Sequence, residues 1–578
     1  MSNKSVYLLI GIIVVIAVGA FAYLQYSSPE NTAASASPSP TVSPTPTFTP
    51  TMTPSATSPS TPSTVPSPTT TSPSPTQSSS PSSAPPSPSS SETVSVTITS
   101  TSASPDSVRV DGTVVSLPAV FQWQVGATHS LQAISPVAGA AGNQYMWTGW
   151  SDNGAQTHTY TVPSSDTTVT ANYKTQYQVT FTQSGLDSSA DETVVTTNMG
   201  SASYADMPFK VWADSGAQIT YTFEANESTT CPRGFFMLAD SANSHTITVN
   251  EPTTVSATYT RAIIDANGKV IQVPDPSKIN RIADSWPAHN TIVVMVGAKE
   301  KLVATATTNT VNPMFQKILP AIETMLTPFN SDGTVNIEAL MAEDPDIVFV
   351  SASGEAAAAA MENSGLLVVR LQFFDFADMV STVHLTGWIL GEDALAKAVT
   401  YIDYFNGVQD EITSVTSQIP TQDRPKVLHI TGTGTSPLSI DAGEGLINTW
   451  INLCGGDNAA AEVPGNMQTV SFEQILSWNP EIILIGSANA NTMKTQLLND
   501  PLWNEITAVK NGDVIANPMG VFDWARYSVE EALNIQWVSQ TFHPDLFSDI
   551  DIRAETQWFY HNFYEYDLSE AEIDAILR

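Results

Sequence analysis

The C-terminal half of the chain alternates two hydrophobic patterns. From about Ile264 onwards, short runs of consecutive apolar residues alternate with longer segments in which apolar residues recur every three or four positions. The first pattern is typical of buried strands and the second of amphipathic helices. Their alternation predicts an α/β domain over residues 263–578.

Two stretches of this domain repeat each other. Residues 336–350 and 471–485 begin with Asn336 and Ser471, and each then places a glutamate and a proline at the same spacing. Asn and Ser favour the start of a helix, and proline bars its continuation. Each stretch therefore predicts a short helix followed by a buried strand, so we expect two similar lobes.

One long helix is predicted between these lobes. Its apolar positions, at spacings of three and four, are Leu395, Val399, Ile402, Phe405, Val408, Ile412, Val415 and Ile419. This pattern indicates a single amphipathic helix of about 25 residues, which at 1.5 Å per residue is about 40 Å long. We expect lobe one at about 263–393, the bridging helix at about 394–419 and lobe two at about 420–578.

Residues 93–262 follow a different pattern. Here Val or Tyr alternates with Thr between turn residues, which predicts antiparallel β-structure. His158-Thr-Tyr-Thr-Val162 recurs as His245-Thr-Ile-Thr-Val249, so we expect two all-β copies at 93–175 and 176–262. They resemble the small all-β repeats of bacterial and archaeal surface proteins.

The N-terminal segment predicts a membrane anchor and a stalk. Residues 6–24 carry no charge and suffice to cross a bilayer as a helix, and Lys4 before them orients the rest of the chain outward. Residues 27–92 consist almost wholly of Ser, Thr and Pro, which predicts an extended stalk. We expect a single-pass anchor at 1–26 on the extracytoplasmic face; a cleaved signal peptide, giving a secreted protein, is the alternative.

Composition excludes several function classes. The chain carries 56 acidic and 21 basic residues, a formal net charge of −35, which argues against nucleic-acid binding through phosphate neutralisation. The two cysteines, Cys231 and Cys454, fall in different predicted domains, so neither a disulfide framework nor a zinc site of cysteine pairs is expected. No catalytic triad order or nucleotide-binding loop stands out, and we expect no enzyme activity.

A series of short motifs runs through the α/β domain. They are residues 281–290, 296–303, 336–350, 385–392, 453–459, 471–485, 501–503, 508–514, 543–547 and 558–560. In this order and spacing, over roughly 300 residues, they resemble the class III solute-binding proteins of ABC importers, of the iron-siderophore and cobalamin type.

The resemblance implies a function and two permease contacts. A protein of this family captures a metal chelate, such as a ferric siderophore, a haem-like group or a corrinoid, and delivers it to a permease and its ATPase. One exposed glutamate on each lobe docks on the permease, and the matching positions are Glu338 and Glu473. The resemblance implies no resident cofactor, and we expect a monomer.

The ligand is expected in the cleft between the lobes, at loops that leave the carboxyl ends of the strands. A chelate presents flat apolar faces and anionic edges, which suit aromatic walls and a charge partner. The candidate ligand-binding residues are Trp286, His289, Phe374, Thr433, Phe522, Trp524 and Arg526. For the aromatics the alternative is core packing, for Arg526 a surface ion pair, and for His289 a structural role.

Two other functions remain open at this point. A protein that binds a bare metal ion needs about three converging His or carboxylate ligands, and His384, His429, His543 and His561 show no paired spacing, so no metal ligands are assigned. An adhesin or envelope protein would instead use its β-repeats for binding.

Overall fold

The computed structural model describes residues 92–578, except for residues 105, 241–243 and 432–437. The predicted anchor, almost all of the predicted stalk, and Thr433 lie outside the described residues. All described residues belong to one structural unit. Within these ranges, no helix is both long enough and apolar enough to cross a membrane.

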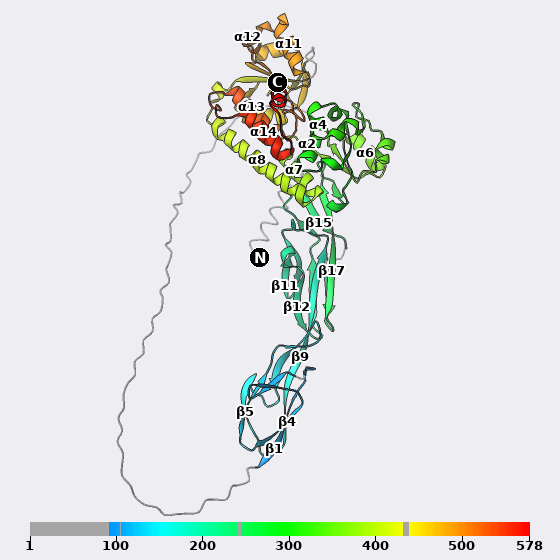
Figure 1. Ribbon diagram of the computed structural model, residues 1–578, viewed down its shortest axis with the longest axis vertical. Coiled ribbons are helices and arrows are strands. Elements are labelled where there is room, and N and C mark those ends of the chain that lie inside the picture. The colour runs from blue at the N-terminus through cyan, green and yellow to red at the C-terminus, as the bar shows by residue number, and fades with distance from the viewer. Residues whose placement is uncertain (1–91, 105, 241–243, 432–437) are drawn as a thin grey trace, which may run out of the picture. The chain divides into compact units, whose positions relative to one another are not determined.

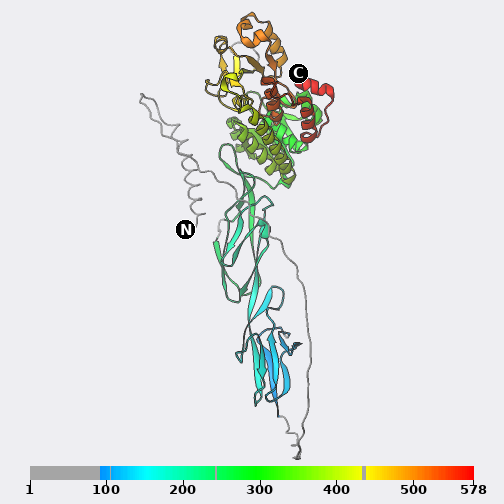
Figure 2. The same ribbon diagram turned by 90° about the vertical axis from the view of Figure 1, so that its left-hand side faces the viewer.

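Residues 93–264 form two β-sandwiches that share a strand. Strand β9 (Thr167–Ser184) begins in the first sandwich and continues into the second (Figure 2). The first sandwich adds β1 (Thr93–Ser100), β4 (Ala119–Gln124), β6 (Val137–Ala138) and β7 (Asn143–Trp150) on one sheet and β3 (Thr113–Val115), β2 (Val108–Val110), β5 (Thr128–Ala133) and β8 (Thr157–Thr161) on the other. The second adds β12 (Phe209–Asp214), β14 (Asn226–Ser228), β15 (Gly234–Leu238) and β17 (Thr253–Ile264), opposite β11 (Gly200–Ser203), β10 (Thr193–Thr197), β13 (Gln218–Phe223) and β16 (Ser244–Thr248).

Each sandwich departs from the predicted antiparallel structure in one pair of strands. The first and last strands pair in parallel, β1 with β9 in the first sandwich and β9 with β17 in the second. This pairing brings two tyrosines to equivalent places. The Tyr173 hydroxyl donates to the carbonyls of Ser107 and Ile134, each at 2.8 Å, and the Tyr259 hydroxyl donates to the carbonyl of Glu224 at 2.9 Å. Both predicted boundaries, after 175 and after 262, fall inside a strand.

Lobe one is a parallel α/β layer. Its sheet has the order β21 (Leu326–Phe329), β20 (Leu302–Ala306), β19 (Ile282–Asp284), β22 (Ile347–Ser351) and β23 (Val368–Leu371). The connecting helices are α2 (Pro287–Met295), α3 (Thr307–Thr310), α4 (Pro313–Ile318), α5 (Ile337–Ala342), α6 (Glu355–Asn363) and α7 (Phe376–Leu390). All four strand pairings in this sheet are parallel, so the carboxyl ends of the strands meet at one edge.

Lobe two is a mixed sheet covered by helices. Its order is β27 (Met467–Val470), β25 (Leu438–Asp441), β24 (Lys426–Thr431), β28 (Ile482–Ile485) and β29 (Val514–Ala516), with β26 (Asp457–Asn458) beside β24. Its helices are α9 (Leu446–Leu453), α10 (Phe472–Trp478), α11 (Ala490–Asn499), α12 (Thr507–Asn511), α13 (Glu531–Phe542), α14 (Ile552–Phe563) and α15 (Glu570–Leu577). As the repeat predicts, Asn336 and Ser471 cap α5 and α10, and the strands β22 and β28 follow.

The bridging helix α8 (Glu392–Thr416) is close to its predicted bounds (Figure 1). Gly391, at φ 113°, separates it from α7, and only glycine adopts this conformation without strain. The predicted positions Phe405, Val408 and Ile412 are buried, but in the first half of the helix the buried residues are Ala394, Ala398 and Tyr401, one position before the predicted ones, and Val399 is exposed. The alanines allow α7 to approach closely, and the Tyr401 hydroxyl donates to the carbonyl of Val529 at 2.9 Å.

A buried arginine joins the second sandwich to helix α7. The Arg261 guanidinium in β17 lies 3.8 Å from the Trp388 ring centroid, and it donates to the Trp388 carbonyl and to the Asp187 carboxylate. Trp388 in turn donates its indole N–H to Ser189 at 3.1 Å. One continuous hydrophobic core runs through this joint, so the second sandwich and the α/β domain are packed together as one body.

Replacing Arg261 with Met should destabilise the described unit by about 3 kcal/mol, because it removes a buried charge pair and a cation–π contact. Chemical unfolding of residues 92–578 measures the change. The matched control is Arg109→Met, since Arg109 is exposed and its guanidinium donates to the Gly112 carbonyl at 3.3 Å, with no ion pair to any described residue. An unchanged unfolding midpoint for the Arg261 variant would contradict this account of the joint.

Candidate functional site

Lobe one presents aromatic rings at the carboxyl ends of its strands. Trp286 follows β19, is partly buried, and lies 4.5 Å from Phe373 between ring centroids. Its backbone N–H is held by the Asp284 carboxylate at 3.0 Å. Phe374, which follows β23, is 45% exposed, and its backbone N–H donates to the Asp378 carboxylate at 3.2 Å. Trp286 and Phe374 therefore have the exposure that a ligand-contacting ring needs.

His289 lies in the protein core and not at the cleft. Its Nδ1 is 2.7 Å from the Asp284 carboxylate and its Nε2 is 2.9 Å from the Thr386 hydroxyl, and the side chain is fully buried. Burial raises the pKa of Asp284, and the contact with His289 opposes that shift. Both ring nitrogens are occupied, so the structure contradicts the prediction that His289 reaches a ligand. The histidine instead ties β19 and α2 to α7.

Lobe two presents a charged cluster on strands β24 and β25, on the loop after β29 and at the C-terminal residue. We call it the lobe-two cluster, and it consists of His429, Asp441, Asp523, Arg526 and Arg578. His429 Nδ1 is 2.6 Å from Asp441 Oδ2, and Arg526 Nη1 is 3.3 Å from Asp441 Oδ1. His429 and Arg526 hold the pKa of Asp441 below its usual value against the opposing effect of burial, whereas burial raises the pKa of Asp523.

Several polar atoms around this cluster have no hydrogen-bond partner among the described residues. They are His429 Nε2, Asp441 Oδ1, the Thr431 hydroxyl, and both side-chain atoms of Asn517. All four side chains are buried. Native proteins rarely leave buried polar groups unpaired, and sites that await a ligand are one reason for it. Arg526 keeps 15% of its side chain exposed and makes one ion-pair contact, so most of its five donors are available to an anion.

The loop between β29 and α13 carries three candidate residues. Phe522 and Arg526 are partly exposed, as a ligand contact requires. Trp524 is fully buried, at 0% exposure, so the prediction that its ring forms a stacking wall is wrong. Thr433, the remaining lobe-two candidate, lies outside the described residues.

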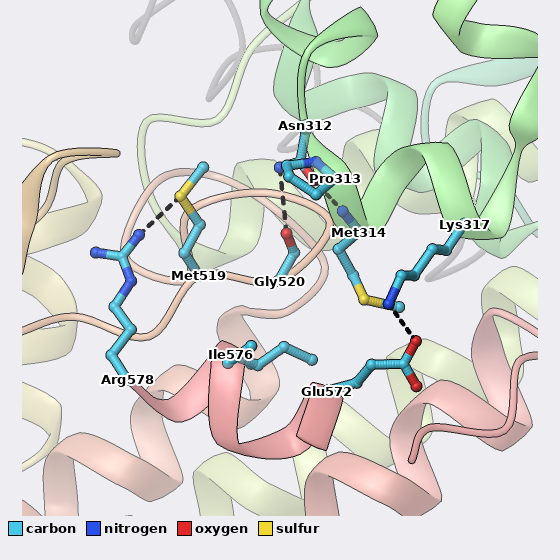
Figure 3. A pocket seen from close by; sticks show the side chains of 10 residues that line it. Asn312, Pro313, Met314, Lys317, Met519, Gly520, Glu572, Ile576 and Arg578 are labelled. Carbon is cyan, nitrogen blue, oxygen red and sulfur yellow. Dashed lines mark hydrogen bonds and ion pairs between the residues drawn. The ribbon is translucent and has the colours of Figure 1, made fainter. Parts of the chain in front are cut away.

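A cavity of about 230 Å³ lies where this loop meets lobe one (Figure 3). Asn312, Met314 and Lys317 line it from lobe one, and Met519, Glu572 and Arg578 line it from lobe two. Lys317 and Glu572 pair across it at 2.5 Å, and this contact is the largest cause that lowers the pKa of Glu572 to about 2. Asn312 donates to the carbonyls of Gly520 and Val521 at 3.2 and 3.0 Å, which fixes the two lobes against each other at this point.

The two predicted docking glutamates occupy corresponding places. Glu338 and Glu473 are exposed, each in the first turn of its capped helix, α5 or α10. Hydrogen bonds from its own backbone N–H and from Ser471 lower the pKa of Glu473. Both side chains are therefore accessible to a partner.

None of His429, Asp441 and Asn517 is among the predicted ligand-binding residues, although the sequence places Asp441 in a cleft loop. Asp441 stands at the end of a strand, which is a usable signal, but a histidine in a buried strand gives none until its neighbours are known. Over the ranges that the structure describes, no group of three His, Cys, Asp or Glu side chains is arranged to hold a metal ion.

The α/β domain is similar to known binding proteins. A family model described as Periplasmic binding protein matches residues 287–519, which lie within this domain. The chain is 24% identical over 319 residues to the molybdate-binding protein MolA of Haemophilus influenzae, covering 50% of this chain and 87% of that protein. It is 22% identical over 219 residues to the Fe(3+) dicitrate-binding periplasmic protein FecB of Escherichia coli, covering 36% of this chain and 69% of that protein.

Two solved structures match about the same share of the chain. A periplasmic solute-binding protein from Veillonella parvula is 27% identical, with a TM-score of 0.48, and the match covers 55% of this chain and 96% of that one. MolA with bound molybdate is 20% identical, with a TM-score of 0.48, and covers 54% and 99%. The periplasmic-binding-protein family model thus matches part of the α/β domain, and both curated relatives are named as binding proteins.

His289→Leu should lower stability by about 3 kcal/mol, because Asp284 would remain buried without its partner. Chemical unfolding measures the loss. His561→Leu is the control, since His561 is 66% exposed in its side chain. Wild-type stability combined with lost ligand binding would instead return His289 to the list of ligand contacts.

Proposed function

We propose that residues 263–578 are the extracytoplasmic substrate-binding component of an ABC importer. They capture a metal chelate with anionic edges, such as a ferric siderophore or a corrinoid, and deliver it to the permease and its ATPase. The proposed N-terminal anchor and stalk hold this receptor at the outer face of the membrane.

The observation that carries the proposal is the incompletely paired lobe-two cluster. Arg526 approaches only Asp441 among the described residues and retains unused donors, and the neighbouring Thr431 and Asn517 side chains are buried without partners. A guanidinium with free donors in a partly desolvated site favours carboxylate or other oxyanion groups. The partly exposed rings of Trp286, Phe374 and Phe522 supply apolar contact area for the body of a chelate.

The two curated relatives support an anionic ligand. One is named for molybdate and the other for Fe(3+) dicitrate. Molybdate is an oxyanion, and citrate binds iron through carboxylates, so both ligands present negatively charged oxygens. A strongly acidic protein, with a net charge of −35, repels anions at long range, so local donors such as Arg526 must offset this repulsion for an anion to bind.

Arg526→Ala should weaken binding of the chelate by about 10- to 100-fold, the usual effect of losing a charged hydrogen bond. Calorimetric titration of residues 92–578 with ferric dicitrate, a ferric siderophore, a corrinoid and molybdate measures the change.

Arg553→Ala is the matched control, because Arg553 pairs with Glu570 and Asp574 on the exposed side of α14. The proposal fails if the wild-type protein binds no member of the panel. It also fails in its site assignment if both arginine variants bind equally well.

We propose further that Glu338 and Glu473 dock on the permease. Replacing both with Gln should reduce chelate uptake by about tenfold, because complementary charge governs such encounters, while the affinity for the chelate stays unchanged. Uptake of labelled chelate, in cells that contain the permease and ATPase, measures this.

The control is the double variant Glu323→Gln and Glu462→Gln, which removes one exposed glutamate from each lobe away from α5 and α10. Wild-type uptake by the Glu338 and Glu473 variant would exclude the docking role.

A further inference from the structure

The loop between β29 and α13 has little regular structure to hold it in place. Residues 517–529 contain no helix or strand, and a single isolated bridge joins Met519 to Asp523. Yet this loop carries Phe522 and Arg526, the two lobe-two residues that the proposed function assigns to the ligand. Hydrogen bonds within the loop join the Gly520 N–H to the Phe522 carbonyl at 3.0 Å and the Arg526 N–H to the Asp523 carbonyl at 3.1 Å, and contacts from outside the loop fix it to the rest of the protein.

The carboxylate of Glu530 supplies several of these contacts. Glu530 Oε2 accepts the backbone N–H of Phe522 at 2.9 Å, and Oε1 accepts that of Val521 at 3.2 Å. The Tyr560 hydroxyl from α14 donates to Oε1 and also accepts the Val521 N–H at 3.1 Å. Glu530 is fully buried, so each of these bonds is made in a low-dielectric surrounding, where it is strong.

The same peptide is held from the opposite lobe. The Val521 carbonyl accepts the Asn312 amide at 3.0 Å, and Asn312 also caps α4 through its side-chain oxygen. Glu530 in lobe two thus accepts the N–H of the Val521–Phe522 peptide unit, and Asn312 in lobe one donates to the carbonyl of the same unit. The loop is fixed both to its own lobe and across the cleft.

Gly520 has no side chain, and this leaves space for the side chains of Glu530 and Tyr560. A Cβ atom there would lie 2.0 Å from the Tyr560 hydroxyl oxygen and 2.1 Å from Glu530 Oε1. Glycine is therefore required for close packing, and not for its backbone conformation. Burial raises the pKa of Glu530 to about 7, while Tyr560 and the two backbone N–H groups oppose the rise because they favour the ionised form.

We infer that Glu530 is a positioning residue for the ligand: it fixes the loop of residues 519–526 so that Phe522 and Arg526 face the cleft. This inference rests on the proposed function for the ligand itself. The role of Glu530 in holding the loop stands on the geometry alone.

Among the buried ionisable groups around the loop, Glu530 is the one whose replacement tests the inference. Tyr560 in α14, Tyr564 directly after α14 and Tyr401 in α8 lie near it, and burial raises the pKa of each tyrosine well above its usual value, so they stay neutral. Glu531, the next residue, is equally buried but bonds Asn534 at 3.0 Å and not the loop. Glu531→Gln is therefore a matched control for Glu530→Gln.

Two measurements at pH 8, where Glu530 is ionised, test the inference on residues 92–578. Glu530→Gln places an amide N–H₂ against the loop donors, so amide hydrogen exchange in residues 519–526 should be about tenfold faster. Affinity for the chelate should fall about tenfold. Gly520→Ala should give both effects without altering a polar group, and Glu531→Gln should give neither.

The outcomes separate the two proposals. If exchange in residues 519–526 is the same in the Glu530→Gln and Gly520→Ala variants as in the wild type, Glu530 does not hold the loop and the inference is overturned. If exchange rises but affinity is unchanged, the loop does not position the ligand and the inference fails in that part. If the wild-type protein binds no chelate while exchange still rises, the loop-holding role stands and the proposed function falls.

Discussion

A buried charge without a partner is costly, and this protein places buried ionisable side chains at the junctions of its parts. Arg261 joins the second sandwich to Trp388. Arg370 binds Glu355 and Glu362 within lobe one, and its guanidinium also lies 3.7 Å from the Asp265 carboxylate in the chain that leaves β17. Glu530 fixes the ligand loop. Because each of these groups is satisfied only when its elements are correctly docked, the pairings specify one arrangement of sandwich, lobes and loop.

Around the lobe-two cluster, buried polar atoms keep unused hydrogen-bonding capacity, and the proposed site lies there. His429, Thr431 and Asn517 are buried with polar atoms that have no partner among the described residues. They lie where the strands of a parallel or mixed α/β layer end, which is where such folds bind ligands. The supporting groups are rigid, because the β-strands carry His429 and Asp441 and the Glu530 network holds the loop with Arg526. The proposed site thus combines rigidly held side chains with polar atoms that have unused hydrogen-bonding capacity.

The sequence predicted the helices and strands better than it predicted the contacts between distant side chains. The caps at Asn336 and Ser471 and the 25-residue bridging helix follow from local spacing, and the structure has them. Trp524 and His289 were misplaced because position in a loop does not tell which way a side chain points; that depends on partners far away, such as Thr386. The parallel ladders of the sandwiches and the role of Glu530 depend likewise on contacts between distant segments, which hydrophobic periodicity does not encode.

The proposed function requires that an anionic metal chelate occupy the cleft between the lobes. The most direct test is a crystal structure of residues 92–578 grown with ferric dicitrate, with diffraction recorded at the iron absorption edge. The account predicts an anomalous iron peak between Trp286 and Arg526, with citrate oxygens within hydrogen-bond distance of the guanidinium. An iron peak on the β-sandwiches or on the outer surface of a lobe, with the cleft unoccupied, would contradict it.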